Sequence, residues 1–369
     1  MNAPRDGQKM CPKIIRMGLV GVGHAEAEQG WIVHSAIPSI AWSRYFPQVK
    51  QNPSAELVAV CDRHEERAKK AVEANFAKEY YLDYEKMLER ADIEAVIITT
   101  PHMTHAAMAI EALKAGKHVL VEKPLASSFA EADRIVKEAK RAKTKLMALP
   151  APSPCMESFN KVKELVDGEY LGKICFAKSR LAHSGPGHAK WYYQKGGGAA
   201  VDLGIYPITK ITGLLGPAKK VQAFFGTAIP ERVSAGEKIK VEVEDNVLIS
   251  LDFGEGALAS VEANYVTILE MEKGSHSEIY GTKGVVFLDR RDQNLSFYSR
   301  IELYAGMEGW IEKTFPAKEY RVVDSFVDSI IHDKKPPYTG EQQRHIIEIL
   351  EAAKESAENG KSIKLNSTF

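Results

Sequence analysis

The sequence is poor in cysteine, and its four cysteines stand far apart. Cys11, Cys61, Cys155 and Cys175 form no C-x-x-C pair. Neither a zinc site built on paired cysteines nor a disulfide framework is therefore expected. Scattered thiols without disulfides are typical of a cytoplasmic protein, and we expect that location.

The chain also lacks a long apolar run and an excess of charge of either sign. No stretch of about 18 apolar residues occurs, so no membrane-spanning helix is predicted. The first residues, MNAPRDGQKMCPK, show no apolar segment of the kind that a signal peptide carries. Lys and Arg together number 49, as do Asp and Glu. Because proteins that bind the nucleic-acid backbone carry a basic excess, we expect no nucleic-acid partner and no membrane partner.

The chain is long enough for two domains, and a proline-rich stretch separates two regions with different sequence patterns. Its 369 residues exceed the usual size of a single hydrophobic core. Residues 149–154, LPAPSP, contain three prolines in six positions, which is typical of a domain hinge. We therefore predict an N-terminal domain of residues 1–150 and a C-terminal domain of residues 151–369.

The N-terminal domain alternates short apolar runs with amphipathic stretches. The predicted strands are 14–22, 57–61, 95–99, 119–121 and 146–149, and the predicted helices are 65–76, 105–115 and 128–142. Short, continuously apolar strands separated by helices are typical of a parallel sheet that helices cover on both faces. The predicted fold class is a doubly wound α/β domain.

Strand-like segments dominate beyond the prolines. They are predicted at 174–181, 220–226, 247–253, 257–265, 278–280 and 285–288, with a hairpin turn at 253–257 and a final helix whose apolar face holds Ile346, Ile349, Leu350 and Ala353. This pattern predicts an α+β domain on a large, mostly antiparallel open sheet. A sheet face that no helix covers needs burial elsewhere, so a homo-oligomer through this sheet is expected.

Two glycines end the first predicted strand, in 18-GLVGVG-23. Gly21 and Gly23 let the backbone turn tightly and approach a pyrophosphate at the start of the next helix. A glycine pair that follows a strand of a βαβ unit predicts a dinucleotide site. The third glycine of the usual G-x-G-x-x-G pattern is missing, since Glu26 stands at its position.

An acidic residue, Asp62, follows the second predicted strand. An acid there binds the ribose diol of NAD, although Arg63 could accept a 2′-phosphate, so NADP is not excluded. In the alternative reading Asp62 only caps the next helix. Gly23 and Asp62 are 62 − 23 = 39 residues apart, against the usual about 20. This excess predicts an insertion within residues 24–53, which either belongs to the cofactor or substrate site or is a surface elaboration.

Three stretches together identify a resemblance to a known family. They are 99-TTPHMTH-105, 121-VEKP-124 and 196-GGGAAVDLGIYPI-208. With the N-terminal glycines, they resemble the Gfo/Idh/MocA family of oxidoreductases over nearly the whole chain. The resemblance implies a Rossmann domain and a second domain whose open sheet forms subunit contacts. It also implies NAD(P)-dependent redox chemistry on sugars, polyols and their derivatives.

The resemblance places Lys123 at the nicotinamide end of the cofactor, facing the substrate. A lysine at the carboxyl end of a parallel strand lies where such sheets bind ligands, and desolvation there is expected to lower its pKa. Asp202 and Tyr206 are four residues apart and share one face if residues 200–215 are helical. Either Tyr206 takes the hydroxyl proton while Lys123 lowers its pKa, or Lys123 is the base and the other two orient the hydroxyl. In a third reading Tyr206 only packs.

The resemblance also implies a wider set of contacts. The expected cofactor-binding residues are Gly21, Gly23, His24, Asp62, Arg63, Thr100, Pro101, His102, His105, Glu122, Lys123 and Trp191. For His105 and Trp191, a capping or packing role is equally open. His183 and His188, in a glycine-containing loop, are expected to contact the substrate together with Lys123, Asp202 and Tyr206, or to provide an alternative base. Carboxylates and histidines do not cluster at metal-ligand spacing, so no metal is predicted.

The predicted function is therefore NAD(P)-dependent hydride transfer between the nicotinamide and a ring hydroxyl of a sugar, polyol or glycoside, or the reverse reduction. The alternative is an NAD-dependent glycosidase. Such family members oxidise the C3 hydroxyl, eliminate the aglycone, add water and reduce the sugar again. The two reactions differ in their products.

Overall fold

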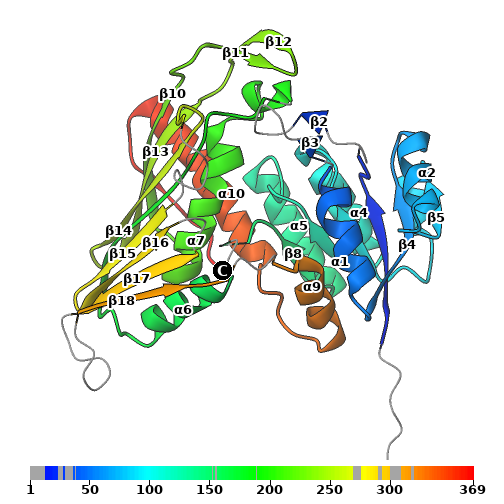
Figure 1. Ribbon diagram of the computed structural model, residues 1–369, viewed down its shortest axis with the longest axis horizontal. Coiled ribbons are helices and arrows are strands. Elements are labelled where there is room, and N and C mark those ends of the chain that lie inside the picture. The colour runs from blue at the N-terminus through cyan, green and yellow to red at the C-terminus, as the bar shows by residue number, and fades with distance from the viewer. Residues whose placement is uncertain are drawn as a thin grey trace, which may run out of the picture.

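The computed structural model describes residues 13–23, 28–29, 36–37, 39–151, 153, 156–187, 189–268, 276–289, 293–299, 309–316 and 320–369. Within these residues two large sheets lie on either side of a group of helices (Figure 1). His24 and His188 lie outside the described residues.

The first sheet is parallel and has six strands in the order β5-β4-β1-β6-β7-β8. Its strands are β1 (Ile15–Val20), β4 (Ala55–Cys61), β5 (Glu79–Tyr81), β6 (Ala95–Ile98), β7 (His118–Val121) and β8 (Leu146–Ala148). The chain order reverses at β1, which lies between β4 and β6. This arrangement confirms the predicted doubly wound domain, and ligands bind such sheets at the reversal point.

Two of the helices in this domain begin at a side-chain cap, provided by Asp83 and by Ser128. The helices are η1 (Ala41–Tyr45), α1 (Phe46–Gln51), α2 (Glu65–Glu73), α3 (Tyr84–Leu88), η2 (His102–Thr104), α4 (His105–Lys114) and α5 (Phe129–Ala142). Ser128 caps α5 by accepting a hydrogen bond from the Glu131 N–H at 3.3 Å. The Glu131 carboxylate accepts from the Ser127 N–H at 3.1 Å, and not from that of Ser128 as a regular capping box requires.

The second sheet has nine strands in the order β18-β17-β16-β15-β9-β14-β13-β10-β19. They are β9 (Ile174–Ala182), β10 (Lys220–Gly226), β13 (Asn246–Gly254), β14 (Ala257–Asn264), β15 (His276–Gly281), β16 (Gly284–Asp289), β17 (Asn294–Ser299), β18 (Gly309–Thr314) and β19 (Ile363–Lys364). All neighbours pair antiparallel except β9 and β14. The predicted mostly antiparallel sheet is therefore confirmed.

Two short hairpins stand apart from the large sheets. One pairs β11 (Glu231–Ser234) with β12 (Glu237–Lys240), and the other pairs β2 (Glu28–Gln29) with β3 (Ala36–Ile37). Within the large sheet, the turn between β13 and β14 places Glu255 and Gly256 at φ +54° and +84°. Two consecutive positive φ angles are typical of the type I′ turn that suits a tight hairpin.

The remaining helices cover one face of the second sheet or pack against the first domain. They are α6 (Met156–Asp167), η3 (Lys190–Tyr193), η4 (Ala200–Gly204), α7 (Ile205–Leu215), α9 (Val322–Ile331) and α10 (Gly340–Asn359). Figure 1 shows α7 and α10 between the two sheets, and α9 beside α1. Among the described residues, no helix combines the length and apolarity that crossing a bilayer requires.

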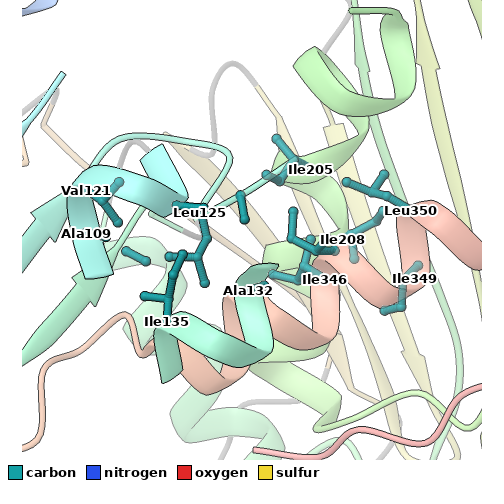
Figure 2. Packing of buried hydrophobic residues seen from close by; sticks show 14 of the residues in the cluster. Ala109, Val121, Leu125, Ala132, Ile135, Ile205, Ile208, Ile346, Ile349 and Leu350 are labelled. Atoms are coloured by element: carbon teal, nitrogen blue, oxygen red, sulfur yellow. The ribbon is translucent and has the colours of Figure 1, made fainter. Parts of the chain in front are cut away.

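A continuous apolar core joins the two domains (Figure 2). Leu125 and Ile135, from the loop after β7 and from α5, pack with Ile205 and Ile208 of α7 and with Ile346 of α10. All five side chains are fully buried. Burying each such side chain stabilises the fold by about 1.5–3 kcal/mol, so this core sets how the end of β7 faces the start of α7.

The last segments of the chain return to the first domain. The Ala148 N–H donates to the Tyr338 carbonyl at 3.1 Å, and Phe326 of α9 packs into the core of the first sheet. Segments that follow residue 150 in the sequence thus pack into the first domain. The predicted boundary between two domains at residue 150 therefore stays a prediction.

Candidate functional site

The candidate residues converge on one edge of the parallel sheet. Gly21 follows β1, Asp62 follows β4, Thr99 and Thr100 follow β6, and Lys123 follows β7. Because the carboxyl ends of parallel strands meet at the same edge, residues far apart in the sequence lie side by side there.

The glycine turn is too tight for any other residue. Gly21 has φ +92°, and a Cβ added to it would stand 2.7 Å from the Thr100 nitrogen. Gly23 has φ +64°, and its added Cβ would stand 2.6 Å from the Ser39 Cβ. A glycine turn of this kind, at the end of the first strand, leaves room for a dinucleotide pyrophosphate to approach the backbone, so the residues present fit NAD.

Asp62 is buried at the end of β4 and ties two segments together. One carboxylate oxygen accepts from the Gly23 N–H at 3.1 Å, and the other accepts from the His64 N–H at 2.9 Å, just before α2. Asp62 therefore both holds the glycine turn and caps the next segment. Arg63 is exposed beside it, and its Nε donates to His64 Nε2 at 3.2 Å.

His105 connects two of the sequence motifs. Its buried ring has Nδ1 2.7 Å from the Pro124 carbonyl oxygen and Nε2 2.8 Å from the Thr100 carbonyl oxygen. Burial lowers its pKa, against the hydrogen bonds to the two carbonyls. The His105 ring therefore links the loop after β6 to the loop after β7. This contact explains why the 99–105 and 121–124 stretches occur together.

His102 and Trp191 meet across the two domains. Their ring centroids are 5.5 Å apart, and Trp191 also stacks on Tyr192 with centroids 3.7 Å apart. Trp191 keeps 43% of its surface exposed, and burial lowers the pKa of His102. Pro101 precedes His102 and is exposed. Both rings are thus placed at the edge where the predicted cofactor contacts gather.

Glu122 links the first helix to the backbone of the predicted catalytic lysine. One oxygen accepts from the Tyr45 hydroxyl at 2.8 Å and from Arg44 at 3.4 Å, while the other accepts from the Lys123 N–H at 3.0 Å. Sequence reasoning missed Arg44 and Tyr45, which carry no motif. They lie on η1, so residues 40–51 of the proposed insertion are helical and form the first helical segment among the described residues beyond the glycine turn.

Lys123 and Asp202 form a buried ion pair. Lys123 Nζ lies 2.6 Å from Asp202 Oδ1, with the two side chains 20% and 2% exposed. Burial lowers the pKa of Lys123, but the Asp202 carboxylate, nearby tyrosines and the hydrogen bond to Asp202 together raise it above its ordinary value. The expectation of a lowered lysine pKa is therefore wrong, because it considered desolvation without the partner carboxylate.

Tyr206 lies against the same ammonium. Lys123 Nζ is 5.3 Å from the centroid of the Tyr206 ring, a cation–π distance. Burial raises the pKa of Tyr206 by more than the Lys123 charge lowers it. Asp202 belongs to η4, a π-helical turn, and Tyr206 follows on α7. Asp202 and Tyr206, from the 196–208 stretch, thus both contact Lys123, as predicted. Because their pKa values are raised, Lys123 and Tyr206 both hold their protons at neutral pH.

Tyr265 completes the cluster and was also missed. Its hydroxyl donates to Asp202 Oδ2 at 2.9 Å, so both carboxylate oxygens of Asp202 have a donor. His183 stacks on the Tyr265 ring with centroids 5.4 Å apart, and its Nδ1 accepts from the Gly185 N–H at 2.8 Å. Burial lowers the pKa of His183 to about 4. His183 is thus a neutral, buried neighbour of Tyr265.

The described residues contain no group of three or more histidine, cysteine, aspartate or glutamate side chains placed to hold a metal ion. The two described cysteines lie apart, with Cys61 buried and Cys175 exposed. Burial raises the pKa of the Cys61 thiol to about 12, so it stays protonated beside the site.

Comparison with known proteins identifies the chain. Residues 15–149 match the model "Oxidoreductase family, NAD-binding Rossmann fold" and residues 159–287 match "GFO/IDH/MocA C-terminal domain". Myo-inositol 2-dehydrogenase of Thermotoga maritima is 24% identical over 95% of this chain and 97% of its own. A dTDP-3,4-didehydro-2,6-dideoxy-alpha-D-glucose 3-reductase of Actinomadura kijaniata is 35% identical over 175 residues, 46% of this chain and 51% of that protein, so the chain spans about half of that relative.

A solved structure shares the whole architecture. Levoglucosan dehydrogenase in complex with NADH and L-sorbose superposes with a TM-score of 0.80 at 21% identity, over 96% of this chain and 99% of that one. At this identity the likeness establishes the fold. With both family models matched in order along it, the chain belongs to the Gfo/Idh/MocA family of oxidoreductases, with an NAD-binding Rossmann domain followed by the family's C-terminal domain.

Proposed function

We propose that the protein is an NAD-dependent dehydrogenase or reductase that interconverts a ring secondary alcohol and a ketone of a sugar, polyol or glycoside. The observation that carries the proposal is the Lys123 ammonium, held at the end of β7 by Asp202 at 2.6 Å and flanked by the Tyr206 ring. Relatives named as an inositol dehydrogenase, a levoglucosan dehydrogenase and a dTDP-sugar reductase support this substrate class.

The cofactor contacts of this proposal follow the sheet edge. Gly21 and Gly23 would hold the pyrophosphate, Asp62 the adenosine ribose, and His102 and Trp191 the nicotinamide end. Bound NAD supplies the site that gives or takes a hydride. A buried carboxylate at the ribose favours NAD over NADP, because a 2′-phosphate there would meet a like charge. Exposed Arg63 is the residue through which NADP would bind.

Lys123 handles the proton in this proposal. Its ammonium donates a hydrogen bond to the substrate oxygen and, in the reductive direction, gives that oxygen a proton from Nζ. In the oxidative direction the hydroxyl proton is taken by the small fraction of Lys123 that is present as the neutral amine. Asp202 keeps the ammonium charged and oriented, and the Tyr206 ring lies against the same ammonium. The Asp202 carboxylate, 2.6 Å from Lys123 Nζ, supports the lysine as the group that stores the proton.

Product analysis tests the proposal and separates it from the glycosidase alternative. The purified protein is incubated with NAD and a panel of sugars, polyols and aryl glycosides, and the products are followed by absorbance at about 340 nm and by mass spectrometry. A keto product with stoichiometric NADH supports the dehydrogenase. Free aglycone without net NADH supports the glycosidase. Lys123→Ala is expected to lose turnover and to keep its affinity for NAD.

The second sheet supports the proposed homo-oligomer. Its uncovered face carries a row of aromatic rings, with centroid distances of 6.2 Å for Phe176–Tyr280, 6.0 Å for Tyr280–Phe287 and 5.8 Å for Phe287–Trp310. Trp310 is 59% exposed. An exposed aromatic row on a soluble protein marks an interaction surface, and a second copy is the partner we propose.

A further inference from the structure

We propose that Tyr265 is a positioning residue for the Lys123–Asp202 pair: its hydroxyl fixes the second oxygen of the carboxylate and so sets where and how strongly Asp202 acts on Lys123. The inference rests on the proposed function, because it concerns the proton that Lys123 exchanges with the substrate.

The hydrogen bonds of Asp202 show that it acts through Lys123. Oδ1 lies 2.6 Å from Lys123 Nζ, and Oδ2 accepts from the Tyr265 hydroxyl at 2.9 Å. The side chain is only 2% exposed. A buried carboxylate is tolerated only when donors satisfy it, and here the two donors occupy both oxygens. Asp202 therefore presents its charge to Lys123.

Tyr265 is itself held rigidly. Its N–H donates to the Asp245 carbonyl at 2.7 Å, and its carbonyl accepts from Arg232 at 2.9 Å. Arg232 also pairs with the fully buried Asp245 carboxylate at 3.1 Å. The ring stacks on His183 and meets the edge of Tyr193 at 5.7 Å. A fully buried phenol whose backbone is hydrogen-bonded and whose ring packs on two other rings is suited to orienting a neighbour.

The hydroxyl also limits the pull of Asp202 on the ammonium. A carboxylate that accepts from two donors divides its negative charge between them, so removal of one donor strengthens the bond to the other. Without the Tyr265 hydroxyl, Lys123 is expected to hold its proton to higher pH. The other titratable groups that interact with Lys123 or Asp202 are Tyr206, Tyr192, Tyr193, His183 and His102. The charged groups Glu122, Arg44 and Arg232 act on these neighbours.

Tyr265→Phe tests the inference, with Tyr193→Phe as the matched control. Tyr193 is an adjacent buried tyrosine whose hydroxyl donates to the Pro186 carbonyl at 2.9 Å and does not bond Asp202. We expect kcat to fall about tenfold or more in Tyr265→Phe, as for the loss of a hydrogen bond to a charged group, with the Kd for NADH unchanged. Tyr193→Phe is expected to stay within about twofold of the wild type.

A second readout needs no activity. Competitive acetylation of Lys123 across pH, followed by mass spectrometry of its peptide, measures the neutral amine fraction directly. The midpoint is expected to move to higher pH in Tyr265→Phe and to stay in place in Tyr193→Phe. A Tyr265→Phe protein with wild-type kcat and an unmoved midpoint would overturn the inference.

A double variant keeps the test decisive if Tyr265→Phe does not fold. Asp202→Asn removes the buried negative charge. Adding Tyr265→Phe then leaves no buried carboxylate oxygen without a hydrogen-bond donor, so the double variant is expected to fold. It should be as active as Asp202→Asn alone, because the two side chains act through one contact. A double variant slower by more than about threefold contradicts the inference. A wild-type protein without dehydrogenase activity would instead remove the proposed function, while the acetylation midpoints still report on Tyr265.

Discussion

At the scale of single residues, the site depends on one buried ion pair between the two domains. Burial alone would drive Lys123 toward the neutral amine, and the Asp202 carboxylate reverses this tendency. The raised pKa means that the ammonium persists to higher pH than for an isolated lysine. The proposed reductive direction therefore begins with its proton donor already charged.

Removing the carboxylate tests this balance. In Asp202→Asn the desolvation of Lys123 remains and the favourable charge is lost, so the pKa of Lys123 falls and its acetylation midpoint moves to lower pH. This direction is opposite to that expected for Tyr265→Phe. We also expect kcat to fall about 10- to 100-fold, from the loss of a charged hydrogen bond. A midpoint that stays in place or rises would contradict the assignment of Asp202 as the group that raises the lysine pKa.

Sequence reasoning reached some residues of the site and not others. Lys123, Asp202 and Tyr206 stand in motifs that the family resemblance covers, so their convergence was predictable. Tyr265, Arg44 and Tyr45 stand in no motif, and only the tertiary fold brings them to Asp202 and Glu122. The sign of the lysine pKa shift was missed for the same reason, since it depends on a contact between residues 79 positions apart.

At the scale of elements, the strongest sequence signals were the continuously apolar strands. β1, β6 and β7 are almost fully buried, so their residues had to be apolar whichever face they point to. Strand β5 escaped prediction because it is a three-residue edge strand with two exposed positions. The exposed positions of β5 leave it without a continuous apolar pattern.

The glycine turn offers a paired test. Gly21→Ala places a Cβ 2.7 Å from the Thr100 nitrogen, at φ +92°. Gly116→Ala has a similar strain, at φ +74°, but no atom within 4 Å of its Cβ. We expect Gly116→Ala to lower the free energy of unfolding by about 1 kcal/mol and to leave NAD affinity intact. Gly21→Ala should cost more stability and lose NAD affinity, as calorimetry and titration would measure. Wild-type NAD affinity in Gly21→Ala would argue against the glycine turn as the pyrophosphate cradle.

The cap of α5 is a local contribution to stability. Ser128→Ala removes the acceptor of the Glu131 N–H at the start of this helix. The expected loss is about 1 kcal/mol in the free energy of unfolding, measured by chemical denaturation. Activity should not change, because α5 carries none of the proposed site residues. A loss of NAD affinity in this variant would show that the helix position matters to the site.

At the scale of the whole molecule, the core between the domains holds the proposed catalytic groups in place. Ile208 of α7 and Ile346 of α10 are fully buried in the cluster that also contains Leu125, two positions beyond Lys123 (Figure 2). The sequence indicated an apolar face on the last helix, but not that this face would pack against the first domain. Such a contact depends on the course of the chain rather than on local pattern.

Truncation in this core should affect stability and rate together. Ile208→Ala removes buried methyl groups and is expected to cost about 2–5 kcal/mol of unfolding free energy. Because α7 carries Tyr206 and follows Asp202, kcat should fall while the Kd for NAD stays near the wild-type value. Ile14 is 48% exposed and precedes β1 at the end of the strand away from the site, so Ile14→Ala provides the control and is expected to leave both unchanged. Equal effects of the two variants would contradict the role of this core.

The uncovered sheet face belongs to the same scale. Trp310→Glu places a charge in the exposed aromatic row, and we expect the oligomer to dissociate by at least one step in light scattering or sedimentation. The folded content by circular dichroism should not change, because Trp310 is 59% exposed. An unchanged mass would contradict the proposed interface on this face.

The most direct test of the account follows the hydrogen that leaves the substrate. A sugar or polyol that the enzyme accepts is labelled with deuterium at the carbinol carbon, and the NADH formed in a single turnover is analysed by mass spectrometry. We predict that wild-type protein places the deuterium on the nicotinamide, while Lys123→Ala, binding NAD with unchanged affinity, does so at least about 100-fold more slowly. Equal rates of transfer in both proteins would contradict the account.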